Sequence, residues 1–183
     1  MRAFDLICKD LYRYTGGGNF WKTFFVIPGF KYTCYLRLFQ TFKDNKWLRF
    51  FCILLKIKIL LMQRHYGIQI PESTRIGEGF YIGHFGTIVV NAKAVIGKNV
   101  NISQGVTIGV ANRGRHKGVP IIGDSVYIGP GAKIIGNIVV GNNVAIGANA
   151  VVVSDVPENA CVAGIPAKVI SMNGSEGYVN RKV

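Results

Sequence analysis

The fold is decided by residues 122–152, which read IGDSVYIGPGAKIIGNIVVGNNVAIGANAVV. A large aliphatic residue recurs at every sixth position of this stretch, and glycine follows most of these residues. Neither the 3.6-residue period of a helix nor the two-residue period of a strand requires such spacing. A short repeat of fixed length indicates one structural unit stacked on the next. With two interruptions, the repeat also occurs upstream, at Ile70, Ile76, Ile82, Ile88, Ile96, Ile102 and Ile108.

Each hexad is interpreted as one short strand followed by a corner. The large aliphatic side chain points inward, and an apolar residue two positions earlier, as Val126 precedes Ile128, fits strand alternation. Glycine suits the corners because it carries no Cβ atom. Three hexads then form one triangular coil, and stacked coils enclose Ile and Val between parallel strands. The repeat therefore predicts a mainly β fold, a parallel β-helix over residues 67–170. It leaves the hand of the coil open, because crossovers between parallel strands are normally right-handed.

Two breaks interrupt the repeat. Ile88 and Ile96 are eight residues apart, which indicates two inserted residues. Ile108 and Ile122 are fourteen apart, so this segment holds either two hexads with two extra residues or one long excursion. Residues 110–119 are polar, basic and rich in glycine, which is typical of a loop. Loops that leave a rigid scaffold often carry function, so we expect an excursion loop at residues 110–119.

Residues 1–66 form a different segment, which is aromatic, aliphatic and basic and lacks the hexad. The pattern predicts helices over residues 31–42 and 47–65. The second is too interrupted by charge to be a clear membrane span, which needs about 20 mostly apolar residues. It either packs against the solenoid or a sister subunit, or lies on an anionic membrane surface. At the other end, residues 171–183 are interpreted as a loose polar tail.

The composition narrows the partners and the location. The net charge of +13 favours anionic partners, namely nucleic acid, phosphate-bearing cofactors or an acidic membrane face. No groove-reading motif supports nucleic-acid binding, so we expect none. The four cysteines are scattered and predict neither a disulfide framework nor a zinc site, and no metal is expected. Reduced thiols and the lack of a signal-peptide pattern favour the cytoplasm, with peripheral contact on the inner face of the plasma membrane as an option.

The histidines are the best candidates for chemistry. His84 follows a predicted turn, so its side chain should leave the solenoid at a corner, where an imidazole can take a proton from a hydroxyl. His116 lies in the excursion loop beside Arg115. His65 ends the apolar helix and is interpreted as structural. No G-x-S-x-G, P-loop or H-E-x-x-H pattern competes with these residues.

Several motifs together resemble the hexapeptide-repeat acyltransferases, within their serine-acetyltransferase-like branch. The resemblance covers about residues 24–170 and rests on IGEGFYIGH at 76–84, QGVTIG at 104–109, IGPGAKIIGN at 128–137, IGANAVV at 146–152 and AGIPAK at 163–168. It implies a left-handed parallel β-helix with a short N-terminal helical segment. It also implies acetyl-CoA as the donor and a homotrimer with active sites between subunits.

The resemblance also implies roles for single residues. His84 would be the general base, which removes a proton from the acceptor hydroxyl in a ternary complex with acetyl-CoA. Arg115 and His116 would hold the acceptor, and Gln69 would orient His84. The coenzyme would be bound by four residues: Gly109, Pro130, Ala148 and Lys168.

Two positions depart from the serine enzymes. Gly83 stands where those enzymes carry an Asp that helps to bind the amino acid, and Gln69 stands where a second Asp pairs with the histidine. Losing a binding group for the ammonium of serine argues for another acceptor. The short, basic N-terminal segment is similar to relatives that acetylate capsular or colanic-acid-type polysaccharides. We therefore expect an acetyl-CoA-dependent O-acetyltransferase acting on a sugar hydroxyl in surface polysaccharide biosynthesis. Serine O-acetyltransferase of cysteine biosynthesis and a non-enzymatic scaffold are the alternatives.

Overall fold

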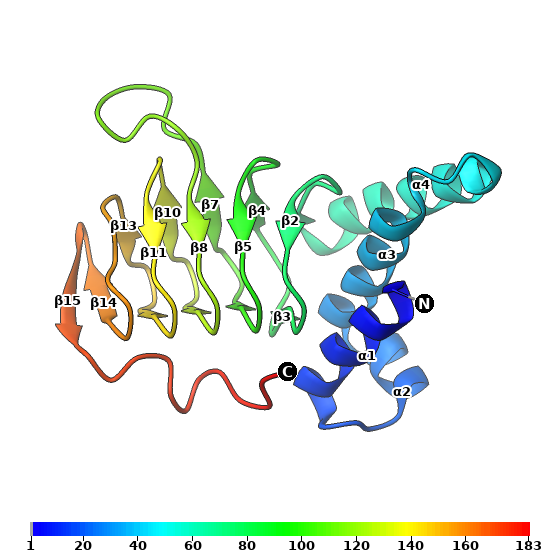
Figure 1. The fold of residues 1–183 in the computed structure, drawn as a ribbon, viewed down its shortest axis with the longest axis horizontal. Helices are drawn as coiled ribbons and strands as arrows, with labels where there is room; N and C mark the ends of the chain where they lie inside the picture. Colours follow the sequence, from blue (N-terminus) through cyan, green and yellow to red (C-terminus); the bar gives the residue numbers. More distant parts are fainter. Residues whose placement is uncertain (1) are drawn as a thin grey trace.

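The computed structural model describes residues 2–183, and it divides into a helical end and a long stack of short strands (Figure 1). The helices are α1 (Arg2–Thr15), α2 (Phe20–Val26), α3 (Pro28–Phe42), the 3-10 helix η1 (Lys46–Leu48) and α4 (Arg49–Tyr66). The first strands are β1 (Ile68–Gln69), β2 (Arg75–Ile76), β3 (Tyr81–Ile82), β4 (Ile88–Val90), β5 (Val95–Ile96), β6 (Asn101–Ile102), β7 (Thr107–Gly109) and β8 (Ile121–Ile122). The remaining strands are β9 (Tyr127–Ile128), β10 (Lys133–Ile135), β11 (Val139–Val140), β12 (Ala145–Ile146), β13 (Val151–Val152), β14 (Cys161–Gly164) and β15 (Ala167–Ser171).

The strands form three sheets that the chain visits in rotation. Sheet A has the order β1-β4-β7-β10-β13, sheet B β11-β8-β5-β2, and sheet C β15-β14-β12-β9-β6-β3. All neighbours pair in parallel except β14 and β15, which close the stack as an antiparallel pair. Consecutive strands from β1 to β13 therefore lie on successive faces of a three-sided coil. This confirms the prediction of a mainly β chain with parallel sheets and N-terminal helices.

The hexad isoleucines and valines form the core as the repeat predicted. In sheet C, Ile82 pairs with Ile102, Ile102 with Ile128, and Ile128 with Ile146, so each rung stacks on the next. These side chains are fully buried. A column of aliphatic groups buried on every side is what parallel strands covered on both faces require.

The first interruption of the repeat lies elsewhere than predicted. Val90, not Ile88, pairs with Ile108, while Ile88 pairs with Ile68 of the preceding coil. Ile88 and Val90 both point inward from the three-residue strand β4. The six-residue spacing of Ile82 and Ile88 is therefore coincidental. The two extra residues lie in the corner between β3 and β4, not between Ile88 and Ile96.

The second interruption is one long excursion. Ile108 lies in sheet A and Ile122 in sheet B, which are successive faces of one coil, so no complete hexad separates them. The intervening chain leaves the stack as a loop, visible between β7 and β8 in Figure 1. A bridge between Ala111 and Gly118 closes its base.

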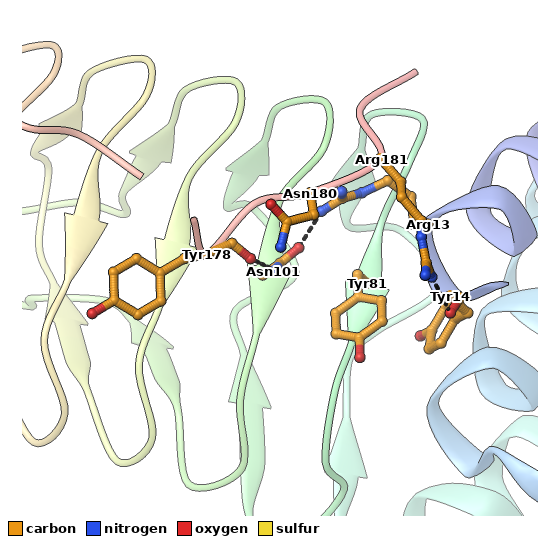
Figure 2. Close-up of a pocket in the computed structure, with 7 residues that line it drawn as sticks. All are labelled: Arg13, Tyr14, Tyr81, Asn101, Tyr178, Asn180 and Arg181. Atoms are coloured by element: carbon orange, nitrogen blue, oxygen red, sulfur yellow. Dashed lines mark hydrogen bonds between the residues drawn. The ribbon is translucent and has the colours of Figure 1, made fainter. Parts of the chain in front are cut away.

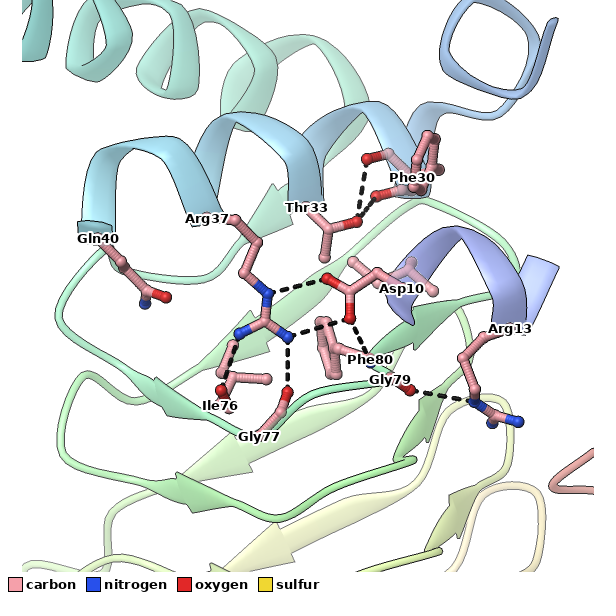
Figure 3. Close-up of polar contacts among 12 residues, drawn as sticks. Asp10, Arg13, Phe30, Thr33, Arg37, Gln40, Ile76, Gly77, Gly79 and Phe80 are labelled. Carbon is pink, nitrogen blue, oxygen red and sulfur yellow. Dashed lines mark hydrogen bonds and ion pairs between the residues drawn. The ribbon is translucent and has the colours of Figure 1, made fainter. Parts of the chain in front are cut away.

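The N-terminal segment contains two helices, α1 and α2, that the hydrophobic pattern did not predict. α1 and α3, together called here the cap, pack against the first coil and are joined to it by the buried side chains of Asp10 and Arg37 (Figure 3). Arg37 Nε donates to Asp10 Oδ2 at 2.8 Å, and its two terminal nitrogens donate to the carbonyls of Ile76 at 2.8 Å and Gly77 at 2.6 Å. The Phe80 backbone N–H donates to Asp10 Oδ1 at 2.8 Å. The cap is therefore tied to the backbone of β2 and of the turn before β3.

The C-terminal segment is not loose, which corrects the expectation for residues 171–183. It returns along sheet C towards the helical end (Figure 1). The buried Ser175 hydroxyl donates to the Ser125 carbonyl at 2.6 Å, and the Asn101 side chain donates to the Tyr178 carbonyl at 2.9 Å. Side chains of the segment and of sheet C thus pair with backbone carbonyls that would otherwise need water, and these bonds hold the segment in place.

Candidate functional site

His84 lies exposed at the corner between β3 and β4, where the chain passes from sheet C to sheet A. The equivalent corners of later coils stack above it and form one edge of the prism, called here the His84 edge: residues 83–87, 103–106, 129–132 and 147–150. Backbone hydrogen bonds join successive corners, from Gly105 N to Gly86 O at 2.9 Å and from Gly131 N to Gln104 O at 2.9 Å. Asn149 N continues the series by donating to Pro130 O at 2.8 Å.

This stacking brings together three of the predicted site residues. His84, Pro130 and Ala148 all belong to the His84 edge, where the corner at 103–106 lies between His84 and Pro130, and Ala148 follows on the next coil. The corner that carries His84 is the one widened by the two inserted residues, and Gly86 in it has a φ of 113°. Such a backbone conformation favours glycine. The insertion therefore produces the distinctive corner on which His84 is presented.

The end of α4 supports the His84 corner. The ring of Phe85, the next residue, packs edge-on against Tyr66 with ring centroids 5.4 Å apart. Tyr66 is the last residue of α4, and the following Gly67 N–H donates to the Gln63 carbonyl. The sequence analysis did not identify Phe85 or Tyr66. An aromatic residue directly after a corner histidine was the available signal, but its partner comes from the helical segment.

The predicted acceptor residues lie at a different edge. Arg115 is exposed and His116 half-buried in the loop that leads from sheet A to sheet B, called here the loop edge. The His116 carbonyl accepts a hydrogen bond from Asn137 N at 2.8 Å, so the next coil anchors the loop. The width of sheet A separates the loop edge from the His84 edge. One copy of the chain therefore does not bring His116 to His84.

The other predicted residues are dispersed. Gln69 is exposed on sheet A and lines a cavity of about 340 Å³ with Arg64 and Thr87, and His84 is absent from that lining. Within residues 2–183 no hydrogen bond joins Gln69 to His84. Gly109 ends β7 at the loop edge, where an added Cβ would lie 2.8 Å from Ile135 Cδ1. Lys168 is exposed on β15 and pairs with Ala163 at the far end of sheet C.

Gly83, which precedes the histidine, adjoins the packed rings of Tyr81 and Tyr14, called here the aromatic wall. A Cβ atom there would lie 3.1 Å from Cε1 of Tyr81. The Tyr81 ring lies against Tyr14 of α1, with centroids 4.4 Å apart. The Tyr14 hydroxyl accepts from Ile82 N at 2.8 Å, and burial raises the pKa of this phenol. α1 therefore reaches the strand that leads into the His84 corner.

A polar cavity of about 260 Å³ lies beside this wall, between α1, sheet C and the C-terminal segment (Figure 2). Buried Arg13 donates to the Gly79 carbonyl at 3.1 Å and to the Asn101 side chain. Arg181 of the C-terminal segment donates to the Tyr14 carbonyl at 2.7 Å. These contacts connect the two ends of the chain. The described part of the chain, residues 2–183, contains no group of three His, Cys, Asp or Glu side chains placed to hold a metal ion.

Comparisons with known proteins point to one family. The model of the bacterial transferase hexapeptide (six repeats) matches residues 120–154. A serine acetyltransferase of Staphylococcus aureus strain Mu50 is 44% identical over 108 residues, which cover 59% of this chain and 51% of the relative. The chain thus spans about half the length of the curated relatives it matches.

Solved structures extend the similarity into the helical segment. The Neisseria gonorrhoeae serine acetyltransferase in complex with serine is 30% identical, has a TM-score of 0.72, and is matched over 92% of this chain and 68% of its own. A serine acetyltransferase in complex with CoA is 31% identical, with a TM-score of 0.73 and coverage of 92% and 69%.

These comparisons correct the expected acceptor. The prediction of a sugar hydroxyl in surface polysaccharide biosynthesis is wrong, because the matched relatives are serine acetyltransferases and one of the matched structures is a complex with serine. The departures at Gly83 and Gln69 concern two residues, whereas the match extends over 108 residues. The predicted enzyme class, an acyltransferase that uses acetyl-CoA, agrees with the relatives and with the CoA complex. The chain belongs to the hexapeptide-repeat acyltransferases of the serine acetyltransferase type.

Proposed function

We propose that this chain transfers the acetyl group of acetyl-CoA to the hydroxyl of L-serine. The observation that carries the proposal is the 44% identity over 108 residues with serine acetyltransferases. The fold similarity to structures with serine and with CoA bound supports it, because it covers 92% of this chain. The His84 edge supplies an exposed imidazole, which the reaction needs as a base.

His84 acts in this proposal as the general base. Its imidazole takes the proton of the serine hydroxyl while the oxygen attacks the thioester carbonyl carbon. The tetrahedral intermediate collapses, the C–S bond breaks, and the thiolate of CoA receives the proton from the imidazolium. An imidazole suits both steps because its ordinary pKa lies near neutrality. The exposed corner leaves room for the two substrates.

The coenzyme is proposed to lie along the His84 edge. Pro130 and Ala148 present a ring and a methyl group at two successive corners of the edge that carries His84, and such small surfaces leave space for a long flexible thiol arm. Lys168 is the proposed partner for phosphate. Gly109 lies at the loop edge, across sheet A from His84, so it would contact the coenzyme from a neighbouring subunit. The net charge of +13 favours a strongly anionic donor.

We propose a homotrimer of left-handed coils, with active sites between subunits. The separation of the His84 edge from the loop edge supports this assembly. A site that uses both His84 and the pair Arg115 and His116 must take them from two copies, because sheet A lies between them within one chain. The loop of one subunit then delivers cationic side chains to the acceptor beside the histidine of its neighbour.

The departures at Gly83 and Gln69 affect how well serine binds. Without a carboxylate next to His84, the ammonium group of serine has one partner fewer. We therefore expect the KM for serine to be higher than in serine acetyltransferases that carry this Asp, with a smaller difference in kcat. Gly83→Asp tests this point, because the backbone of Gly83 does not require glycine and the added Cβ would meet only the edge of the Tyr81 ring, at 3.1 Å. The variant should lower the KM for serine.

The central experiment measures CoA thiol release by the purified full chain with acetyl-CoA and L-serine. We expect serine-dependent release, which His84→Ala lowers by about 10² to 10⁴-fold. His65→Ala is the matched control, since His65 is exposed on α4 and its ring packs against that of the neighbouring Tyr66. Calorimetry should show that His84→Ala still binds CoA. Absence of serine-dependent release would refute the acceptor, and near-normal turnover by His84→Ala would refute the base.

A further inference from the structure

α4 buries one narrow stripe of side chains and leaves the opposite face apolar. Cys52, Leu55, Ile59 and Met62 are spaced three and four residues apart and pack against the rest of the protein. A stripe of this spacing covers one side of a helix. It accounts for the docking of α4, but not for the other apolar residues of this helix.

The opposite face carries a second apolar row. Phe50, Leu54, Ile57 and Leu61 are spaced four, three and four residues apart and are 74%, 49%, 49% and 54% exposed. At 100° per residue, this row lies about half a turn from the buried stripe. The flanking apolar side chains Ile53, Leu60 and Trp47 are also exposed, Trp47 almost completely. A contiguous row of exposed apolar side chains of this kind is typical of an interaction site.

Basic residues border this row. By the same helical geometry, Lys58 lies on one side, and Arg49 and Lys56 lie on the other. Residues 45–71 contain no Asp or Glu. Among the described residues 2–183, α4 forms one salt bridge, from Lys56 to Glu72 at 2.9 Å. The exposed face is therefore apolar in the middle and positive at its borders.

We infer that the exposed face of α4 binds the surface of an anionic phospholipid bilayer. A helix with this pattern lies in the interface, with its apolar row among the acyl chains and its basic borders at the headgroups. In residues 2–183, no helix is both long and apolar enough to cross a bilayer. Two copies meeting through this face would bring their positive borders together, whereas anionic headgroups neutralise them.

The position of α4 in the fold permits this contact. α4 extends outward from the first coil at the end of the molecule remote from β15 (Figure 1). A bilayer that holds α4 therefore leaves most of the coil stack accessible to soluble substrates. The inference is independent of the acceptor proposed above, because it uses no residue of the His84 edge.

The experiment measures co-sedimentation of the full chain with vesicles of phosphatidylglycerol and phosphatidylcholine, and with phosphatidylcholine alone. We expect binding to the anionic vesicles that weakens with salt, and little binding to neutral ones. Leu54→Glu with Leu61→Glu should reduce anionic-vesicle binding at least tenfold while serine-dependent CoA release is unchanged. Val139→Glu with Val169→Glu is the matched control. These valines lie outside α4 and are about as exposed as Leu54 and Leu61, and the two substitutions add the same charge.

A second measurement locates the contact. The chain has two tryptophans, so in a Trp21→Phe variant the fluorescence reports on Trp47 alone. Its emission should shift to shorter wavelength when anionic vesicles are added. Failure of the wild-type chain to bind anionic vesicles would overturn the inference, as would equal binding by the Leu54 and Leu61 variant. A change of oligomeric mass in that variant, measured by light scattering without vesicle binding by the wild type, would assign the face to a subunit contact instead.

Discussion

Replacing Arg37 with methionine tests the cap that joins the helices to the first coil. Methionine retains the apolar stem and removes the guanidinium. Asp10, which is 1% exposed, then loses its ion-pair partner, and the carbonyls of Ile76 and Gly77 lose a donor. The Phe80 N–H remains on Asp10, so the carboxyl is not left wholly without partners.

The magnitude follows from the burial of the pair. Removing one partner of a buried ion pair costs about 3–5 kcal/mol, because the remaining charge is uncompensated. For a chain of this size, each kcal/mol lowers the melting temperature by about 2–4 °C. We therefore expect Arg37→Met to melt roughly 6–20 °C below the wild type.

Protonation of Asp10 gives the prediction a second signature. Burial raises the pKa of the Asp10 carboxyl, and the charge of Arg37 opposes that rise. Without Arg37 the pKa of Asp10 rises further. A carboxyl whose pKa is raised in the folded state destabilises the folded protein as the pH increases through that pKa. The deficit of Arg37→Met should therefore be smaller at pH 5 than at pH 8. The double variant Asp10→Asn with Arg37→Met should recover part of the loss, because no charge then remains buried.

Thermal unfolding followed by circular dichroism at both pH values measures these differences. A double-mutant cycle gives the coupling between Asp10 and Arg37. Turnover should also fall in Arg37→Met, because the Phe80 backbone held by Asp10 leads into the strand before His84. A melting shift below about 2 °C, or strictly additive effects in the cycle, would refute the assignment of this pair as the link between cap and coil.

Three further predictions concern the core, the C-terminal segment and an ion pair. Ile128→Asp should prevent folding because it buries an unpaired charge, whereas Ile121→Asp, at an exposed position, should retain the wild-type dichroism spectrum. Ser175→Ala should destabilise by about 1–3 kcal/mol, since it leaves the Ser125 carbonyl without the donor that the buried Ser175 hydroxyl supplies, and limited proteolysis should then release the C-terminal segment sooner. Hydrogen bonds from two lysines lower the pKa of Glu78, so its contribution to stability is present above the ordinary carboxyl pKa and is lost as the pH falls through the lowered value. Glu78→Gln should flatten the pH dependence of unfolding between about pH 3 and 5, and an unchanged slope would contradict this role.

The sequence predicted the coil well because its signal is local and repeated. Ile82, Ile102, Ile128 and Ile146 stack as fully buried rungs of one column, and the periodicity alone identified all four as inward residues. The repeat also predicts the exposed corner that carries His84, because its spacing indicates where each turn lies. The acyltransferase family followed from motifs within these coils.

The position of the first insertion could not be read from spacing. Ile88 and Val90 both satisfy the inward pattern, and only the pairing of Val90 with Ile108 shows which one continues the register. The residues Gly83 and Gln69 alone do not identify the acceptor, because two changed side chains carry less information than a match over 108 residues.

By itself the sequence determined the repeat, the buried column and the exposed corner histidine, because each depends on residues close together in the chain. Only the tertiary structure decided where α1 and the C-terminal segment lie, since their contacts join residues far apart, as in Arg181 with Tyr14. The tertiary structure also decided that sheet A separates His84 from His116. That separation arises from the way successive strands rotate around the prism, which no local pattern of side chains expresses.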